Sequence, residues 1–372
     1  MFHIYQHERW PEFTWDANSL SGLFGQVSFA QGRLLGNMDQ LGLRERKEAS
    51  ALVLAQETAE SSEIEGVSLN MEQIRSSVCN RLALHVPAPK TEDARAAGAT
   101  EVLLDATQNF EKPLTKTRLF SWHSALFPGG FSGTEKIRVG AFRQDNHGRM
   151  QVVSSRGGRE TVHFEAPPAE VVPEEMTRFL ARFAKPGGNT LADAAIAHMY
   201  FLTIHPFEDG NGRLARAVTE MMLARSENSS LRFYSMSSAI QKNKRSYYDI
   251  LEKTQAQNSL DITPWTEWFL KTLLSAITDA ETTMRNVLAK AEFWRDNNAR
   301  VTDPDQRKIL NRLFDGFEGN LTSSKWAKIC KCSQDTATRA IRDLIEKKIL
   351  QQAGAGRSTH YVLREHQAKH NS

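Results

Sequence analysis

The 372-residue sequence predicts a mainly α-helical protein with a small β-hairpin, and three stretches carry this prediction. Residues 43–64 contain no Gly or Pro, and their apolar residues recur at helical spacing. Residues 190–203, TLADAAIAHMYFLT, are apolar on nearly every helical face, which is typical of a buried central helix. Residues 150–164 instead contain two extended runs around a Gly-containing turn, which predicts a hairpin.

Start and stop signals place the neighbouring elements. Gly66 ends the first helix, and Asn70 with Gln73 resembles a capping box that opens the next one. Residues 85–90, HVPAPK, predict a turn or short linker. Pro173 is placed to open a helix over residues 173–184. Residues 213–225 and 263–295 are predicted to form further helices.

The last 70 or so residues predict three helices followed by a strand-forming hairpin, the pattern of a winged helix-turn-helix. Its recognition helix would be in residues 333–348. The side chains expected to be exposed there are Ser333, Gln334, Thr336, Thr338, Arg339 and Arg342. These residue types can bind phosphates and base edges, but nearby acidic residues dilute the positive charge. We favour a docking or regulatory role and leave DNA binding open.

Composition narrows the class of protein. The formal net charge of +3 is too small to indicate a nucleic-acid or membrane partner by itself. The three cysteines complete no metal site. The N-terminus lacks an apolar signal core, and no run reaches the roughly 18 apolar residues of a membrane helix. We therefore expect a cytoplasmic protein without a membrane partner.

The stretch HPFEDGNGRLAR, from His205 to Arg216, concentrates residues suited to phosphate chemistry. Its Gly-Asn-Gly segment can curl so that successive N–H groups point at one place, and a helix that begins there adds its positive end. Such a nest is an anion site. Arg213 and Arg216 share one helical face and can neutralise phosphate oxygens.

Two further side chains of the stretch predict the reaction type. A lone carboxylate beside phosphates, here Asp209, commonly holds Mg²⁺. The neutral imidazole of His205 can take a proton from an attacking hydroxyl. Together they predict phosphoryl or nucleotidyl transfer. Any one of these residues alone could equally be a cap, a turn or a solvated face.

The stretch resembles the Fic family motif H-x-F-x-[D/E]-G-N-G-R-x-x-R at every specified position. The resemblance implies an AMP transferase (AMPylator) that uses ATP and Mg²⁺, with His205 as the catalytic base, Asp209 as the metal ligand and Phe207 anchoring the loop in the core. The residues then expected to bind ATP and its phosphates are Glu208, Asp209, Gly210, Asn211, Gly212, Arg213 and Arg216.

A second pattern resembles the family's inhibitory segment. SSEIEG, residues 61–66, fits [S/T]-x-x-x-E-[G/N], and the resemblance implies that Glu65 pairs with Arg216 and holds ATP in an unreactive pose. A surface glutamate at a helix end is the plain alternative. Some inhibited relatives also use this glutamate to remove AMP with water, and the sequence does not decide whether this chain does.

The resemblance also implies the remaining organisation. Residues 1–110 would form an N-terminal helical module with the inhibitory helix, with Trp10, Phe13 and Trp15 packing it onto the core. Residues 111–290 would form the catalytic core, whose hairpin would be a flap that aligns a target segment by strand pairing. Residues 300–372 would form the winged helix. Asn243, Tyr247 and Tyr248 would contact adenine, although an aromatic pair on a helix is often part of the core.

The expected partner is a target protein that presents a Ser, Thr or Tyr hydroxyl, and self-modification and a homodimer remain open. Two alternatives also remain. The protein could be an ATP-sensing, DNA-binding transcriptional regulator, or a Fic enzyme that uses another nucleotide donor. His205 favours the transferase, because a transfer reaction needs a catalytic base whereas nucleotide binding alone does not.

Overall fold

A computed structural model describes residues 2–84, 93–146, 148–156, 159–184, 191–314, 317 and 319–364. These residues form two compact units, Met1–Glu281 and Thr282–Ser372, and the boundary falls within the long helix α11 (Thr263–Asn297). The fold is mainly helical with three small antiparallel strand pairs, as the sequence predicts. The predicted linker at residues 85–90 lies outside the described residues.

The N-terminal part of the first unit is a set of helices that follows the sequence signals closely. After the short 3₁₀ helix η1 (Ile4–Gln6) come α1 (Ala17–Met38), α2 (Leu43–Ile64), α3 (Met71–Arg81) and α4 (Ala94–Gln108). Helix α2 has the predicted bounds, and its buried Leu54 belongs to the same apolar cluster as Ile74 of α3 and Leu103 of α4. The predicted cap of α3 is confirmed, because Asn70 accepts the N–H of Gln73 at 3.1 Å.

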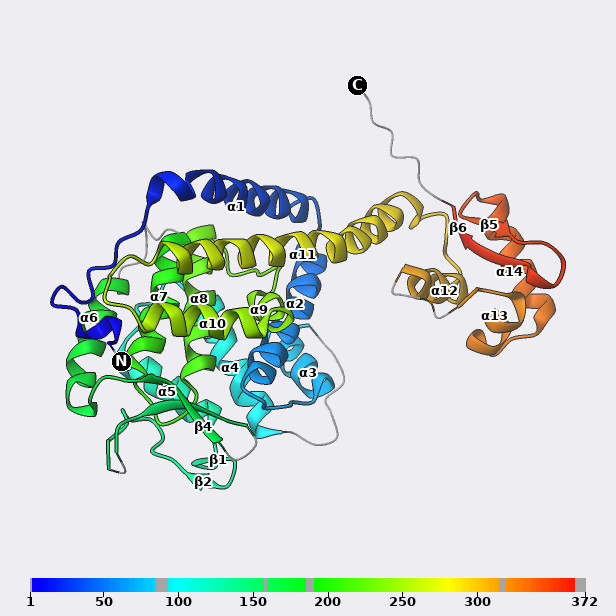
Figure 1. Cartoon of the computed structure of the whole chain (residues 1–372). Coiled ribbons are helices and arrows are strands. Elements are labelled where there is room, and N and C mark those ends of the chain that lie inside the picture. Colours follow the sequence, from blue (N-terminus) through cyan, green and yellow to red (C-terminus); the bar gives the residue numbers. More distant parts are fainter. Residues whose placement is uncertain are drawn as a thin grey trace. The chain divides into compact units, whose positions relative to one another are not determined.

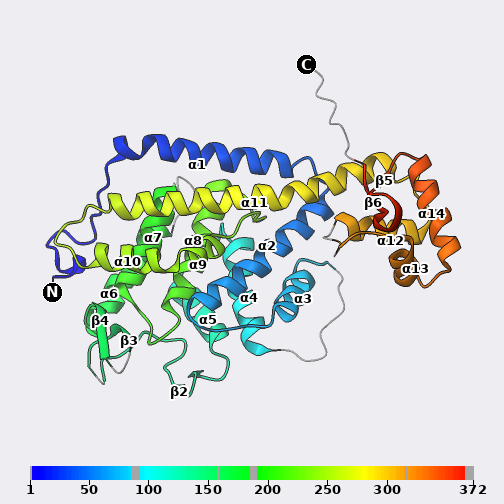
Figure 2. The same ribbon diagram turned by 45° about the vertical axis from the view of Figure 1, so that its right-hand side comes forward.

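Two adjacent helices, α7 (Leu191–Ile204) and α8 (Asn211–Glu227), form the centre of the first unit. Every residue of α7 except Asp193 is buried, which confirms the predicted central helix. Helices α5 (Lys116–Leu126) and α6 (Val172–Phe183, after η2, Ala169–Val171) pack against this pair. Figures 1 and 2 show α1 beside the first part of α11 on one side of α7 and α8, with the β-hairpins on the opposite side.

The chain then returns across the unit through α9 (Met236–Lys242) and α10 (Lys244–Gln255).

The N-terminal segment packs against the central helices as expected. The indole of Trp10 donates to Glu175 at 2.8 Å, and the rings of Trp10 and Phe13 lie 5.1 and 5.5 Å from that of Tyr200 in α7. The predicted boundary at residues 110 and 111 stays a prediction.

The predicted hairpin is confirmed as β3 (Gln151–Arg156) paired antiparallel with β4 (Arg159–Glu165). Its register shifts between Val152 and Val153, so that Val152 pairs with Phe164 and Val153 with Val162. Phe164 is buried against the ring of His3, whereas Val153 and Val162 remain about half exposed. A smaller pair, β1 (Phe131–Ser132) and β2 (Glu135–Lys136), precedes it.

The second unit contains α12 (Pro304–Phe314), α13 (Ser323–Cys330), α14 (Gln334–Glu346) and the antiparallel pair β5 (Leu350–Ala353) and β6 (His360–Leu363), with η3 (Gly356–Ser358) between the strands. Trp326, Ile341 and Leu344 lie in its core. This element order is the predicted one. That the unit is a winged helix-turn-helix stays a prediction.

The predicted recognition helix corresponds to α14, and five of its six predicted side chains are exposed. Thr338 is the exception. It is partly buried, and its hydroxyl donates to the carbonyl of Gln334 one turn earlier. Over the described residues, no helix combines the length and the apolar character needed to cross a membrane.

Candidate active site

The loop between α7 and α8 carries His205, held in a left-handed backbone conformation with φ of +51°. Non-glycine residues adopt this conformation uncommonly, and surrounding contacts stabilise it. Here the buried guanidinium of Arg143 donates from Nε to the His205 carbonyl at 2.7 Å, and the Arg143 N–H donates to the carbonyl of Pro206 at 2.9 Å. The segment before the hairpin therefore clamps the residue predicted to be the base.

The proton position on His205 follows from its hydrogen bond. Nδ1 lies 3.2 Å from the carbonyl oxygen of Leu202, which can only accept, so Nδ1 carries the hydrogen. In the neutral ring Nε2 is then free to accept a proton. Burial lowers the pKa of His205 to about 4, so the imidazole is neutral at pH 7. This is the state that a general base requires.

The loop itself is closed by Asn211, the first residue of α8. Its side chain accepts the Phe207 N–H at 3.0 Å and donates to the Phe207 carbonyl at 2.8 Å. Gly210 has a φ of +82°, and a Cβ there would lie 2.8 Å from the ring of Phe127. Asn211 therefore closes the loop through its two hydrogen bonds to the Phe207 backbone. Phe207 is fully buried, as the resemblance implies.

His123 of α5 is a second histidine of the site, and sequence reasoning missed it. Its Nδ1 accepts the N–H of Gly140 at 3.0 Å, so Nε2 carries the hydrogen and donates to the Asp209 carbonyl at 3.1 Å. The ring stacks on Phe207 at 4.2 Å, and burial lowers its pKa to about 4. No local pattern marks His123, because its partners lie 17 and 86 residues away.

The two arginines of the motif keep unused donors. Arg213 lies over the ring of Phe127 at 4.7 Å and reaches within 3.7 Å of Asp209, and Arg216 is almost fully buried. Within the described part of the chain, Nε of Arg213 and Nη1 of Arg216 are buried without a hydrogen-bond partner. Buried cationic donors are ordinarily paired. Their unused capacity fits an anion bound beside the start of α8.

That position holds a carboxylate of the same chain. Glu65, which directly follows α2, accepts from Nη2 of Arg216 at 2.8 Å. A Cβ on Gly212 would lie 1.9 Å from Oε1 of Glu65, so the carboxylate rests directly on the first turn of α8. Ser61 accepts two more hydrogen bonds from Arg216, from Nε to its hydroxyl oxygen at 2.9 Å and from Nη2 to its carbonyl at 2.7 Å.

The remaining acidic residues of the motif hold neighbouring segments. Glu208 accepts the N–H of Arg138 at 2.8 Å. Asp209 accepts from the hydroxyl of Ser132 at 2.5 Å, and its side chain is still 41% exposed. Among the described residues no group of three or more His, Cys, Asp or Glu is arranged for a metal ion. A single accessible carboxylate nevertheless fits Mg²⁺, which accepts one protein ligand when phosphates and water supply the rest.

The residues predicted to contact adenine are divided by the structure. Tyr247 is buried, with its hydroxyl 2.8 Å from Nε2 of His198. Tyr248 is 40% exposed, and its hydroxyl donates to the carbonyl of Ile64 at the end of α2. Asn243 joins α9 to α10 and is exposed. An adenine contact for these three residues stays a prediction.

Comparison with known proteins agrees with this geometry. Residues 113–223, which include the loop and most of α8, match the Fic/DOC family. This part of the chain is therefore similar to a Fic/DOC family domain. Proteins of this family typically transfer a nucleotide monophosphate to proteins. Residues 3–84, which include Glu65, match a separate domain of unknown function, DUF4172.

Solved structures extend the likeness beyond the Fic domain. A Fic family protein from Desulfovibrio desulfuricans G20 is 23% identical with a TM-score of 0.54, and the match covers 95% of this chain and 98% of that one. At this identity it establishes the fold alone. A Fic-domain signalling protein from Bacteroides thetaiotaomicron (19% identity, 72% and 97% coverage, TM-score 0.49) and Fic-1 from C. elegans (17%, 72% and 74%, 0.44) are also similar. None of the curated proteins matches the sequence.

Proposed function

We propose that this chain transfers AMP from ATP to a protein hydroxyl, releases pyrophosphate, and is restrained by its own Glu65. One observation carries the proposal: the Fic loop presents a neutral imidazole next to a helix N-terminus, and a carboxylate of the chain occupies the anion position there. A site that holds a carboxylate through Arg216 can hold a phosphate with the same donors.

In the proposed reaction the target hydroxyl loses its proton to Nε2 of His205. The oxygen forms a bond to the α-phosphorus of ATP while the bond from that phosphorus to the pyrophosphate oxygen breaks. The hydrogen bond from Nδ1 to the Leu202 carbonyl keeps Nε2 as the accepting atom and stabilises the imidazolium that results. The low pKa means that His205 needs no prior deprotonation at pH 7.

The phosphates would be bound by the α8 amides together with the free donors of Arg213 and Arg216. Gly212 leaves space for a close approach to the backbone, since even the Glu65 carboxylate would collide with a Cβ there. Asp209 would hold Mg²⁺, which when bound would neutralise phosphate charge. The bonds from Ser132 and Gly210 fix the Asp209 carboxylate for that purpose.

Glu65 would inhibit by competition for Arg216. While its carboxylate accepts from Nη2, a phosphate of ATP cannot use the same donor in the same place. Ser61 strengthens the inhibition, because the two hydrogen bonds that it accepts from Arg216 hold that guanidinium facing α2. The donor set that binds ATP productively is therefore incomplete until Glu65 moves away.

The proposal is tested by incubating the Glu65→Gly protein with α-labelled ATP, Mg²⁺ and cell lysate, and identifying labelled bands by mass spectrometry. We expect labelling at least about tenfold above the wild type, since one charge-assisted pair contributes about 1.5–3 kcal/mol. Self-modification is the first product to look for. His205→Ala in the Glu65→Gly background should abolish labelling.

Glu63→Gly is the matched control, because it weakens the same exposed helical turn without removing the Arg216 partner. Equal labelling by the wild type and the Glu65→Gly protein would contradict inhibition by Glu65. ATP binding without any labelling would instead favour the nucleotide-sensing alternative. Parallel reactions with other labelled nucleotides define the donor.

A further inference from the structure

The end of α2 that carries Glu65 is bonded to α10 by a contact outside the Fic motif. The hydroxyl of Tyr248 donates to the carbonyl of Ile64, the last residue of α2, at 3.3 Å. A helix cannot satisfy its last carbonyls internally, so an outside donor stabilises its end. Burial first, and then the charge of Glu65, raises the pKa of Tyr248 to about 12, so the phenol remains a donor at neutral pH.

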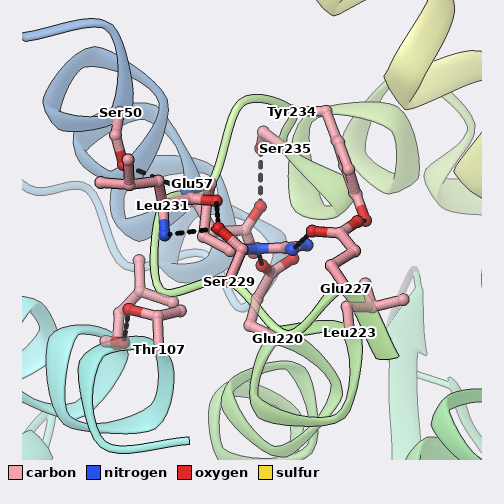
Figure 3. Close-up of polar contacts among 12 residues, drawn as sticks. Ser50, Glu57, Thr107, Glu220, Leu223, Glu227, Ser229, Leu231, Tyr234 and Ser235 are labelled. Carbon is pink, nitrogen blue, oxygen red and sulfur yellow. Dashed lines mark hydrogen bonds and ion pairs between the residues drawn. The ribbon is translucent and has the colours of Figure 1, made fainter. Parts of the chain in front are cut away.

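Two turns earlier, α2 is held much more firmly. The buried carboxylate of Glu57 accepts from the hydroxyl of Ser235 at 2.6 Å, from the N–H of Ser237 at 2.9 Å, and from the Ser237 hydroxyl. Figure 3 shows Glu57 and Ser235 in this polar cluster, with Ser50 of α2 nearby. Ser235 is the N-cap of α9, so the Glu57 charge also lies at the positive end of that helix. Bonds to a buried charge are stronger than the neutral bond of Tyr248.

Beyond Ile64 the helix end is continued by backbone turn bonds and by the ion pair of Glu65 with Arg216. The N–H groups of Glu65 and Gly66 bond to the carbonyls of Ser62 and Glu63 at 3.1 and 2.9 Å, and that of Val67 bonds to Ser62 at 3.0 Å. Glu65 and Gly66 are exposed, and Gly66 has a φ of +74°. Helix ends of this kind open at low free-energy cost. Opening is therefore easiest downstream of Ser61, which accepts two hydrogen bonds from Arg216.

We propose that Tyr248 is a positioning residue for the inhibitory turn: its hydroxyl holds the Ile64 carbonyl and so keeps Glu65 on Arg216. Loss of this bond leaves Glu65 held by Arg216 alone, so that Glu65 leaves the site more often while α2 stays attached at Glu57. The inference rests on the proposed inhibitory role of Glu65. It assigns Tyr248 a regulatory role instead of the adenine contact predicted from the sequence.

A double-mutant cycle tests this role with the wild type, Tyr248→Phe, Glu65→Gly and the double variant. Phenylalanine removes only the hydroxyl. We expect Tyr248→Phe to raise labelling about fivefold when Glu65 is present, as the loss of one neutral hydrogen bond predicts. It should change neither labelling nor ATP affinity in the Glu65→Gly background. Weaker ATP binding by the double variant would overturn the inference and make Tyr248 a nucleotide contact.

Hydrogen exchange supplies a readout that needs no activity. Tyr248→Phe should speed exchange at the amides of residues 65–67 and leave residues 50–57 protected. Ser246→Ala is the matched control, because it removes a hydroxyl of α10 that contacts Trp268 rather than α2. Unchanged exchange at residues 65–67 would overturn the inference. If the Glu65→Gly protein neither binds ATP nor transfers AMP, the proposed function fails. The hydrogen-exchange result still shows whether Tyr248 holds the end of α2.

Discussion

The protonation states of single residues in the site are determined by their neighbours. His205 and His123 both have low pKa values because of burial, and in each ring one hydrogen-bond partner defines which nitrogen carries the proton. His205 thereby presents a free Nε2, whereas both nitrogens of His123 are engaged with backbone groups. Two buried neutral histidines in one site therefore have separate tasks, one chemical and one structural.

Asn211 provides a residue-scale prediction. Asn211→Ala removes both bonds to the Phe207 backbone and leaves a buried N–H and a buried carbonyl unpaired. We expect a loss of about 2–3 kcal/mol in the free energy of unfolding and weaker ATP binding, measured by urea denaturation and by calorimetric titration. Asn211→Asp keeps the acceptor for the Phe207 N–H and should retain part of the stability. Equal stability of wild type and Asn211→Ala would contradict the role of Asn211 in closing the loop.

At the scale of elements, the site depends on which helices and strands meet at the loop. Helix α7 ends and α8 begins there, α2 delivers Glu65 from one side, and α5 delivers His123 from another. The β3–β4 hairpin contributes Val153 and Val162 as a paired, half-exposed apolar surface. In the proposed reaction this hairpin is the element available to align a target segment.

Substitutions in the β3–β4 hairpin should affect target labelling and ATP binding differently. Changing both Val153 and Val162 to Asp should lower labelling of the target protein severalfold, because a charged surface opposes apolar contact and strand pairing by an incoming segment. ATP affinity should not change, since neither side chain belongs to the anion site. Labelled product and calorimetric titration measure the two. Unchanged labelling would show that the target binds elsewhere.

At the scale of the whole molecule, buried ionisable groups determine how stability depends on pH. Burial lowers the pKa of His123 and His205 to about 4 and that of His198 to about 3. These rings contribute stability that is complete above the unfolded pKa of 6.5 and is lost as the pH falls toward 4. Glu220, buried beside Arg232, has the opposite behaviour, because burial raises its pKa to about 8. Its contribution is complete below pH 4.5 and is lost as the pH rises through 8.

The free energy of unfolding should therefore be greatest near pH 6.5. Each group changes it by about 1.4 kcal/mol per pH unit within its window, so three histidines outweigh Glu220 on the acid side. Urea denaturation at pH 5, 6.5 and 8 checks this. Glu220→Gln should flatten the decline between pH 6.5 and 8. A stability that stays constant between pH 5 and 6.5 would contradict neutral burial of the histidines.

Much of the secondary structure could be predicted because its signals are local. The bounds of α2, the cap of α3, the buried α7 and the β3–β4 hairpin follow from periodicity, caps and turn residues within short windows. The predicted exposure of Thr338 was wrong, since the burial of a single side chain depends on the segments packed around its helix rather than on residue type. The partners of His123 could not be predicted either, since they lie 17 and 86 residues away along the sequence.

The sequence by itself determined the chemistry available in residues 205–216: an imidazole, two carboxylates, permissive glycines and two arginines, all within one loop and the first two turns of one helix. The resemblance implied that Glu65 pairs with Arg216, which lies 151 residues away. Only the tertiary structure decided the other contacts, such as the bonds that place the protons of His205 and His123 and the contact of Tyr248 with Ile64 across 184 residues. The physical reason is that residue type and spacing set local backbone preference, whereas the state of a proton or a guanidinium depends on burial and on partners brought together by packing.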